Sequence, residues 1–365
     1  MYVHELAEWP ELTYRAEAVL SELARVRNMQ GTLVGKMTAV GFASRDDAFL
    51  HSLSLDVITS SEIEGKALNL AEVRSSIARR LGIQLQNPVE PSRDADGAVE
   101  MLLDACQHCD EPLTEARLFG WHAALFPTGY NGMYKILVAQ YRDSPMQVVS
   151  GGMGSETVHY EAPAAERVPA EMAAFLAWLN APDGTDLLIK AALAHFWFVT
   201  IHPFEDGNGR IARAISDLLL TRSDGLSFRC YSLSAQIQKE RKDYYRLLEA
   251  AQRGDGDITL WVQWFVGCVG RAIVAAEATL SAVFAKADFF RSHEATALNG
   301  RQRTMLAMLF DGFEGNLTSG KWAKLTHCSA DTALNDLTDL VRKGILRKAE
   351  SGGRSTHYLL AGAGR

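Results

Sequence analysis

Apolar residues recur at helical spacing through most of the chain, which predicts a protein built almost entirely of helices. The longest such pattern covers residues 11–42, where apolar side chains from Leu12 to Met37 fall on one helical face. The same spacing predicts further helices at residues 46–60, 70–81, 94–108, 114–125, 166–180, 185–201, 209–222, 234–253 and 257–283. We therefore expect an all-α fold.

One segment, from Tyr134 to His159, departs from the helical period. It contains β-forming residues such as Ile136 and Val148. The glycines that favour a turn within it are Gly151, Gly152 and Gly154. This composition predicts one small β-hairpin in helical surroundings.

The segment 301–365 forms a separate pattern. Its expected elements are helices at Arg303–Phe310, Ser319–Leu325 and Ala330–Lys343, then strands at 344–348 and 356–360 around a turn at 351–354. Three helices followed by a hairpin are typical of a winged helix.

A polar connector with two prolines, at residues 84–93, marks an earlier boundary. The predicted domains are thus an N-terminal helical domain at 1–90, a helical core at 91–285 and a winged-helix-like domain at 286–365.

Composition adds only a few limits to this picture. Hydrophobic residues make up 47% and charged residues 22%, which is ordinary for a globular protein, and a net charge of −7 favours neither nucleic acid nor membrane. No stretch approaches the roughly 18 uninterrupted apolar residues of a membrane span, and the N-terminus shows no secretory signal. Five cysteines form no disulfide framework, so a reducing, cytoplasmic location is expected. Cys106 and Cys109 have zinc or redox spacing but lie in a helical stretch, where a structural role is favoured.

The chemistry gathers in one loop between two predicted helices. Residues Ile201 to Arg210 read IHPFEDGNGR, after an apolar helix and before an amphipathic one. Gly207 and Gly209 permit positive φ and a close approach of ligand to the backbone. Their N–H groups, with those that open the next helix, form a concave nest that suits phosphate.

Charged residues of this region extend the same interpretation. Arg210 and Arg213 are three positions apart at the start of a helix, so both guanidinium groups can face one anion. Asp206 would repel a phosphate unless a cation lay between them, which indicates Mg²⁺ held by one carboxylate and phosphate oxygens. His202 is suited to deprotonate a hydroxyl. Together these residues predict a nucleotide phosphate site beside a general base.

Other interpretations of the loop fit less well. Pro203 and the glycines break any helix that would bring His202 and Asp206 together as metal ligands. Arg210 stands where an EF-hand loop has a calcium ligand, and the lysine of a P-loop is missing. The plain alternative is a polar turn between two core helices, with His202 as a structural histidine.

The loop resembles the signature of the Fic (filamentation induced by cAMP) family, His-x-Phe-x-[Asp/Glu]-Gly-Asn-Gly-Arg, and matches it at every position from His202 to Arg210. The match extends to Arg213, to the helix that begins near Met172, and to other segments over most of the chain. The resemblance implies a Fic-type helical core with a small β-hairpin flap, an N-terminal helical domain and a C-terminal winged-helix-like domain.

The resemblance further implies a protein adenylyltransferase, which transfers AMP from ATP to a Ser, Thr or Tyr hydroxyl of a protein. His202 would be the base, Phe204 would anchor the loop in the core, and Asp206 would hold Mg²⁺ against the α- and β-phosphates.

The same resemblance assigns the nucleotide contacts. Asn208 and the amides of Gly207 and Gly209 would cradle the α-phosphate, while Arg210 and Arg213 would bind the outer phosphates. The flap residues that would clamp the target are Thr157, Val158, His159 and Tyr160, and the residues at the adenosine end are Tyr245 and Gln252.

A second motif lies N-terminal to this core. Ser60, Glu64 and Gly65 match [Ser/Thr]-x-x-x-Glu-[Gly/Asn], which resembles the family's inhibitory motif. Glu64 would pair with Arg213 and so compete with the γ-phosphate. By itself a glutamate near a helix end is commonplace, although it opposes the helix dipole there.

Two alternatives stay open. The resemblance also allows a de-AMPylating or bifunctional enzyme, or transfer of a group such as phosphocholine, although paired arginines suit ATP best. The winged-helix-like tail alternatively suggests a DNA-binding regulator. Residues 301–360 carry nine Lys/Arg and six Asp/Glu, and acidic Asp331, Asp336 and Asp339 lie on the candidate reading helix. A protein contact or dimerisation is therefore favoured over DNA.

We expect the substrate that is modified to be a protein, and the sequence does not reveal which protein. Tyr, Ser and Thr residues of the chain allow self-modification, and its helical surfaces allow a homodimer. A membrane partner is not expected.

Overall fold

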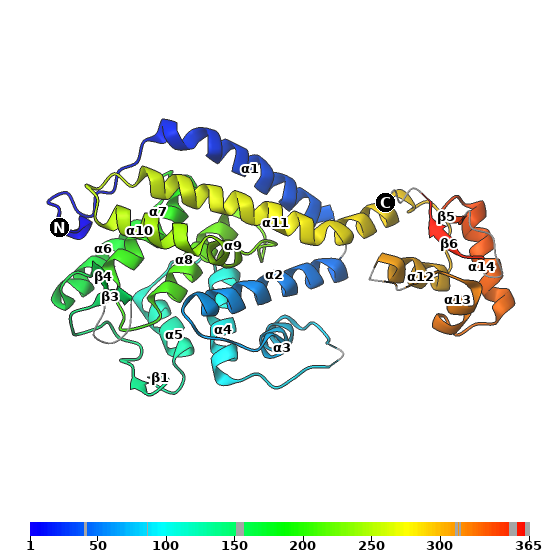
Figure 1. Cartoon of the computed structure of the whole chain (residues 1–365), viewed down its shortest axis with the longest axis horizontal. Coiled ribbons are helices and arrows are strands. Elements are labelled where there is room, and N and C mark those ends of the chain that lie inside the picture. The colour runs from blue at the N-terminus through cyan, green and yellow to red at the C-terminus, as the bar shows by residue number, and fades with distance from the viewer. Residues whose placement is uncertain are drawn as a thin grey trace. The chain divides into compact units, whose positions relative to one another are not determined.

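A computed structural model describes residues 1–39, 42–85, 87–150, 157–310, 313, 315–349 and 356–361. The helices up to residue 292 are η1 (Val3–Glu5), α1 (Ala16–Ala39), α2 (Phe42–Ile63), α3 (Leu70–Leu81), α4 (Arg93–Gln107), α5 (Glu115–Leu125), η2 (Ala165–Arg167), α6 (Val168–Asn180), α7 (Leu187–Ile201), α8 (Asn208–Asp224), α9 (Leu233–Lys239), α10 (Arg241–Gln252) and α11 (Thr259–Ser292) (Figure 1). The strands are short antiparallel pairs, so the all-α class predicted from the sequence is confirmed.

Helix α7 forms the centre of the core. From Leu188 to Ile201 every residue is buried, as expected for a helix that is apolar on all sides. It packs against α6 and α8, and the Trp261 indole N–H of α11 donates to the carbonyl of Ala192, 2.8 Å away. Because the surroundings fix the axis of α7, they also fix the point at which the loop after Ile201 begins.

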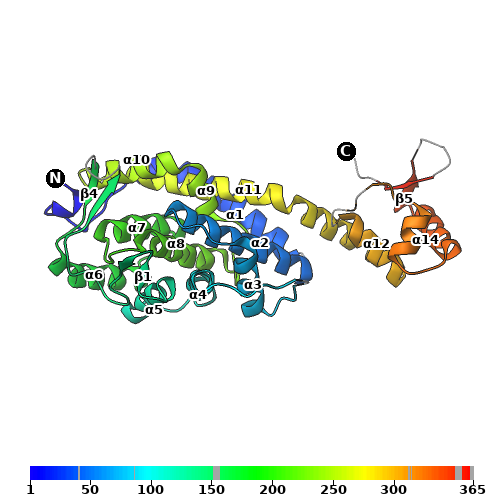
Figure 2. The same ribbon diagram turned by 60° about the horizontal axis from the view of Figure 1, so that its bottom comes forward.

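The hairpin region differs in part from the prediction. It contains two hairpins: β1 (Tyr130–Asn131) with β2 (Tyr134–Lys135), and β3 (Gln147–Ser150) with β4 (Thr157–Glu161). Figure 2 shows β4 near the N-terminal residues, and the His4 ring bonds to the carbonyl of Glu161 at 2.9 Å. The turn glycines Gly151, Gly152 and Gly154 lie outside the described residues.

Several predicted helices have different bounds in the structure, among them the one expected at 46–60, which is α2 (Phe42–Ile63). The helix expected at 234–253 is two helices, because the backbone turns at Glu240, whose carboxylate is held by Trp264 and Arg271 of α11. The helix expected from residue 11 begins at Ala16, since Thr13 instead pairs with Asp257. Helix α11 continues to residue 292, beyond the predicted end at 283.

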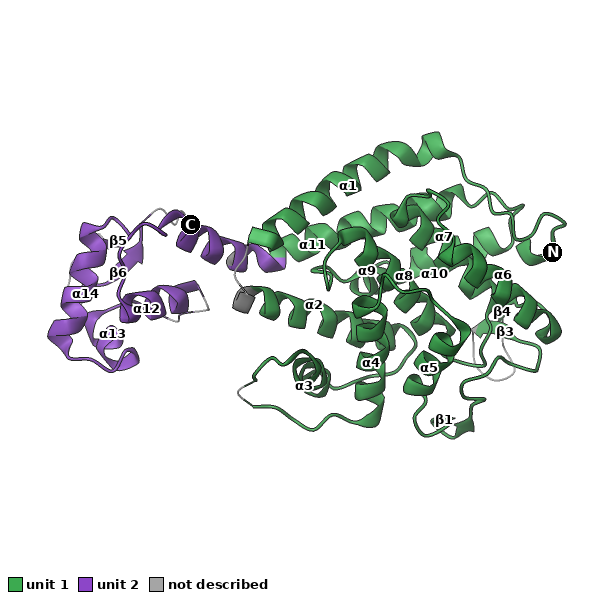
Figure 3. Ribbon diagram, turned by 180° about the vertical axis from the view of Figure 1, so that it is seen from behind, with its two compact units in different colours: residues 1–278 green, residues 279–365 purple. Residues whose placement is uncertain are grey.

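The chain divides into two compact units, Met1–Ala278 and Thr279–Arg365, and the division falls within α11 (Figure 3). The domain boundaries expected near residues 90 and 285 stay predictions.

The second unit contains α12 (Gly300–Phe310), α13 (Ser319–Leu325), α14 (Ala330–Arg342) and the antiparallel strands β5 (Leu346–Lys348) and β6 (Tyr358–Leu360). Trp322 and Leu337 lie in its small apolar core. This order agrees with the three helices and two strands that suggested a winged helix, a name that stays a prediction. The turn expected at 351–354 lies outside the described residues.

All five cysteines are free thiols, and burial raises the pKa of Cys106 on α4 to about 12. A thiol in that setting is an inert core residue. One described helical segment, Thr259–Ser281, has the length and hydropathy of a membrane span. Its residues are mostly buried within the protein, as in the core helix of a globular domain.

Candidate active site

The candidate base, His202, follows the last residue of α7 and has the left-handed backbone angles φ 51° and ψ 60°. Its ring nitrogen Nδ1 lies 3.2 Å from the carbonyl of Val199, so Nδ1 carries the hydrogen and donates it. The lone pair is then on Nε2, and the side chain lines the cleft described below. Burial lowers the pKa of His202, which favours the neutral imidazole that a base requires.

The loop after His202 is held by its own side chains. The Asn208 amide bonds twice to Phe204: its Oδ1 accepts the Phe204 N–H at 3.0 Å and its Nδ2 donates to the Phe204 carbonyl at 2.7 Å. The Phe204 ring is fully buried and stacks on His122 with a 4.3 Å centroid separation. Asn208 therefore shapes the loop, and its side-chain amide is already engaged there.

The N-terminus of α8 is the place where the sequence predicts a phosphate-binding nest. Gly207 has φ 85°, and Ile211 makes the first helical bond by donating to the Gly207 carbonyl. The N–H groups of Asn208, Gly209 and Arg210 precede that bond, at the end of a helix that attracts anions. The Nε of Arg210 is buried without a hydrogen-bond partner in the described structure, and burial lowers the pKa of this residue. Such a group fits a bound phosphate.

Asp206 lies at the mouth of this nest with 29% of its side chain exposed. Its Oδ2 accepts from the Asn131 amide at 2.5 Å, and its Oδ1 lies 3.6 Å from Arg210 Nη2. The described residues hold no cluster of three or more metal-ligating side chains. One exposed carboxylate is nonetheless the protein contribution that Mg²⁺ commonly has when phosphates supply other ligands.

The C-terminal end of α2 contacts the first turns of α8. Arg213 is 1% exposed and its Nη2 lies 2.8 Å from Glu64 Oε1, while its Nε donates to the Ser60 hydroxyl at 2.9 Å. A methyl group built on Gly209 would lie 2.1 Å from Glu64 Oε1, so the carboxylate lies against the first turn of α8. Gly65 follows with φ 76° and ends the helix.

One open cleft of about 1260 Å³ joins seven of the predicted residues. The predicted residues that line it are Glu64, His159, Tyr160, His202, Gly209, Tyr245 and Gln252. Thr157 and Val158 are exposed on the flap strand β4. Tyr160 differs from expectation, because its hydroxyl points into the core and donates to the Thr200 carbonyl at 2.7 Å. Its side chain therefore secures the flap.

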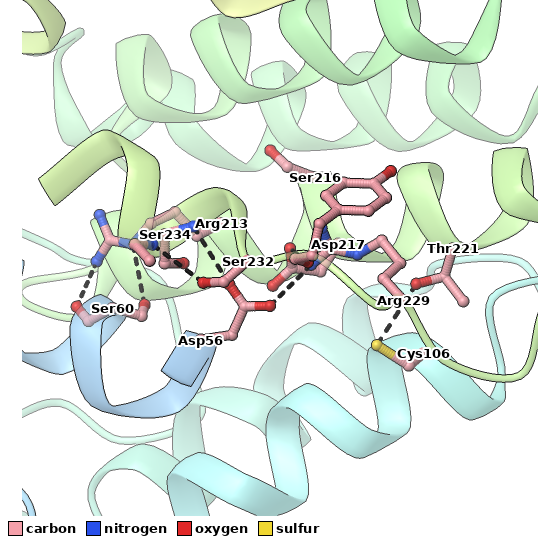
Figure 4. Close-up of polar contacts among 12 residues, drawn as sticks. Asp56, Ser60, Cys106, Arg213, Ser216, Asp217, Thr221, Arg229, Ser232 and Ser234 are labelled. Carbon is pink, nitrogen blue, oxygen red and sulfur yellow. Dashed lines mark hydrogen bonds and ion pairs between the residues drawn. The ribbon is translucent and has the colours of Figure 1, made fainter. Parts of the chain in front are cut away.

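Sequence reasoning missed a buried charge cluster behind the site (Figure 4). Arg229 lies between Asp56 of α2, at 3.2 Å, and Asp217 of α8, to which it also donates. Asp56 Oδ1 further accepts the Ser232 hydroxyl at 2.6 Å. Burial raises the pKa of Asp217 to about 7 despite Arg229. The cluster connects α2 to α8 two turns before Glu64. Its only signal in the sequence is single aspartates within predicted helices.

This cluster predicts a large loss of stability on Arg229→Met. Two buried carboxylates would lose their cation, so the free energy of unfolding should fall by about 3–5 kcal/mol at pH 8. The loss should shrink toward pH 5, where Asp217 is protonated in both proteins. Urea unfolding followed by circular dichroism measures it. Arg246→Met, at an exposed pair with Asp243, is the control and should change less than about 1 kcal/mol. Equal effects of the two substitutions would contradict the assignment.

Two segments of the chain match known protein families, and the chain is similar to known adenylyltransferases. Residues 112–220 match the Fic/DOC family, and residues 2–83 match a domain of unknown function, DUF4172. The protein adenylyltransferase Fic of Nematostella vectensis is 26% identical over 220 residues, which are 59% of this chain and 47% of that protein. That of Drosophila mojavensis is 35% identical over 104 residues, 28% and 19% of the two chains. The matches thus span less than half the length of each relative.

The fold is also similar to a solved structure. A Fic family protein from Desulfovibrio desulfuricans superposes with a TM-score of 0.60 at 21% identity, over 98% of this chain and 99% of the other. The likeness extends through the N-terminal helices and the second unit. At 21% identity, this structural similarity shows a shared fold and nothing more.

Proposed function

The chain is a Fic family protein, and from this premise we propose that it is a protein adenylyltransferase that transfers AMP from ATP to a Ser, Thr or Tyr hydroxyl of a protein. One observation carries the proposal: a histidine whose Nε2 carries the lone pair lines the same cleft as Gly209, in the first turn of α8. The similarity of the chain to the protein adenylyltransferases named above supports the proposal.

The chemistry assigned to His202 is proton removal. Nε2 takes the proton of the target hydroxyl, whose oxygen then forms a bond to the α-phosphorus of ATP. The bond from that phosphorus to the bridging oxygen breaks and pyrophosphate leaves. The hydrogen bond from Nδ1 to Val199 holds the ring in the tautomer this step needs.

The phosphates would lie over the first turn of α8. The amides of Gly209 and Arg210 would bind the α-phosphate, and the guanidinium groups of Arg210 and Arg213 the outer phosphates. Asp206 would hold Mg²⁺, which would neutralise charge on the phosphates and on the leaving pyrophosphate. Tyr245, 38% exposed, would lie at the adenosine end of the cleft together with Gln252.

The target would pair with the flap. Strands β3 and β4 form a two-stranded sheet, and an extended peptide can add a strand to an exposed edge. Such pairing is made by backbone groups and admits many sequences. Self-modification is a further proposal, since the chain has its own Tyr, Ser and Thr residues.

The donor and the metal are tested with labelled nucleotides. With the full-length Glu64→Gly variant, label at the α-phosphate should enter protein in Mg²⁺, label at the γ-phosphate should not, and chelation by EDTA should abolish incorporation. CDP-choline should raise the melting temperature less than ATP with Mg²⁺. Transfer of the γ-label, or stronger stabilisation by CDP-choline, would exclude AMP transfer as proposed.

For the second unit we propose a contact with protein or with a second copy of the chain. Asp336 is paired with Arg301 at 2.8 Å, and Asp339 with Arg342 and Lys343. Three of the nine Lys/Arg residues at 301–360 are thus engaged by acidic side chains and are less available to phosphate. We further propose a cytoplasmic location for the protein, because its five cysteines are free thiols.

The DNA alternative predicts a different outcome in a gel shift. The full-length protein is expected to leave a mixed-sequence duplex unshifted at 150 mM salt, about physiological ionic strength, because its net charge is −7. A salt-dependent shift that Arg347→Ala abolishes would instead favour DNA as the partner. Arg246→Ala, which removes one positive charge from an exposed pair of the first unit, is the control for a change in net charge alone.

A further inference from the structure

Arg142 lies outside every motif of the sequence, yet it is 2% exposed and contacts the candidate base directly. It follows β2 and precedes β3, in a segment without regular structure. Its guanidinium Nε donates to the carbonyl of His202 at 2.8 Å, and Nη2 reaches the carbonyl of Ile201 at 3.4 Å. Its backbone N–H donates to the Pro203 carbonyl at 2.9 Å. The residue therefore caps the end of α7.

The same guanidinium also holds the flap. Nη1 donates to the carbonyl of Ser144, three residues before β3, at 2.9 Å. Nη2 donates to the carbonyl of Pro163, two residues after β4, at 2.5 Å. One side chain thus joins both ends of the β3–β4 hairpin to the backbone of His202.

The hydrogen bonds of Arg142 in the described structure end on backbone carbonyls rather than on a carboxylate. A buried cation bound in this way is costly, and burial lowers its pKa. The C-terminus of α7 compensates part of the cost, because helix C-termini attract positive charge. His202 itself is in the left-handed region, which a residue with a side chain seldom occupies. Arg142 bonds to the carbonyl of this strained residue and can hold it there.

We propose that Arg142 is a positioning residue that fixes the His202 base relative to both ends of the target-binding flap. This inference rests on the proposed AMP transfer. In this proposal the buried arginine has two effects. It fixes the distance between the base and the target hydroxyl, and it places a positive charge beside the imidazole. Loss of the first lowers the rate of transfer, and loss of the second shifts its pH dependence.

The sign of the pH effect follows from the charges around His202. Burial lowers the pKa of His202, and its hydrogen bond to Val199 raises it. Of the neighbouring charges, Arg142 lowers this pKa, while Glu64 and Asp206 raise it. In a Glu64→Gly background only Arg142 and Asp206 of these remain. Removing the cation should then raise the pKa of the base, so the acidic limb of the pH–rate profile should move to higher pH.

The test compares Arg142→Gln and Arg142→Lys, each combined with Glu64→Gly in the full-length protein. The readout is the rate of AMP incorporation at saturating ATP and the ATP concentration for half-maximal rate, as functions of pH. We expect the glutamine variant to lose at least about tenfold in rate, with half-saturation unchanged and the acidic limb moved upward. The lysine variant should recover part of the rate and keep the limb in place.

Arg222→Gln is the matched control, because Arg222 also donates to a backbone carbonyl, that of Cys109, at 2.7 Å, but lies in the last turn of α8, at the opposite end of that helix from the His202 loop. A folded glutamine variant with a rate within twofold of its parent and an unmoved limb overturns the proposal. If that variant fails to fold, the lysine variant decides, since an unchanged rate there excludes a positioning role. Failure of the Glu64→Gly parent to incorporate AMP would instead count against the proposed function.

Discussion

Replacing His202 by alanine in the Glu64→Gly background should lower the rate of AMP incorporation by about 10²–10⁴-fold, the usual contribution of a positioned general base. The expectation rests on the tautomer that Val199 imposes and on burial, which keeps the imidazole neutral. ATP affinity should change little, because the anion-binding groups belong to α8. The rate is followed by transfer of label from the α-phosphate at saturating ATP, and affinity by calorimetry with Mg²⁺.

His108→Ala is the control for this experiment. His108 is an exposed histidine whose ring pairs with Glu111 on the surface, so its removal should leave incorporation unchanged. If His202→Ala retains the rate of its parent, another group accepts the proton and the catalytic assignment is wrong. If it instead abolishes binding of ATP, His202 contributes to the nucleotide site and the loss of rate has a different cause.

The sequence predicted the helical class and the loop from His202 to Arg210 well, for a physical reason. Their signals are local: helical periodicity comes from neighbours three and four positions apart, and the glycines of the loop are needed for its own backbone. Gly207 indeed has φ 85°, and Asn208 bonds to Phe204 within the same loop. A local device of this kind can be recognised in one stretch of sequence.

The remainder of the site depends on contacts between distant segments. Arg142 acts on the backbone of Ile201 and His202, and backbone carbonyls carry no residue-specific signal. Arg229 meets Asp56 across 173 positions, and each of these charges alone resembles an ordinary surface residue. The break at Glu240 has the same origin, since its carboxylate is bound by Arg271 of another helix. These features depend on tertiary contacts, and a single sequence does not show which distant residues contact each other.

Replacing Glu64 by glycine should raise AMP incorporation by about 10- to 100-fold. Glu64 Oε1 lies 2.8 Å from Arg213 Nη2 and against Gly209, where the outer phosphates of ATP are proposed to bind. A nucleotide must displace this pair before Arg213 can contact it, and each 1.4 kcal/mol of that cost lowers the population of the competent complex tenfold. The variant keeps the bonds from Arg213 to Ser60, so the arginine should stay in place.

Glu62→Gly is the matched control, because Glu62 lies two residues before Glu64, in the last turn of α2, but pairs with Gln238, at 2.7 Å, and not with Arg213. It introduces the same helix-breaking residue and should leave incorporation near that of the unsubstituted protein. An unchanged rate in Glu64→Gly would remove the inhibitory assignment, whatever the control shows. A gain in incorporation accompanied by loss of AMP removal from modified protein would give Glu64 a second role, the positioning of water, and would make the enzyme bifunctional. A gain without any removal activity in the unsubstituted protein leaves inhibition as its sole role, since the pair with Arg213 then accounts for the whole effect.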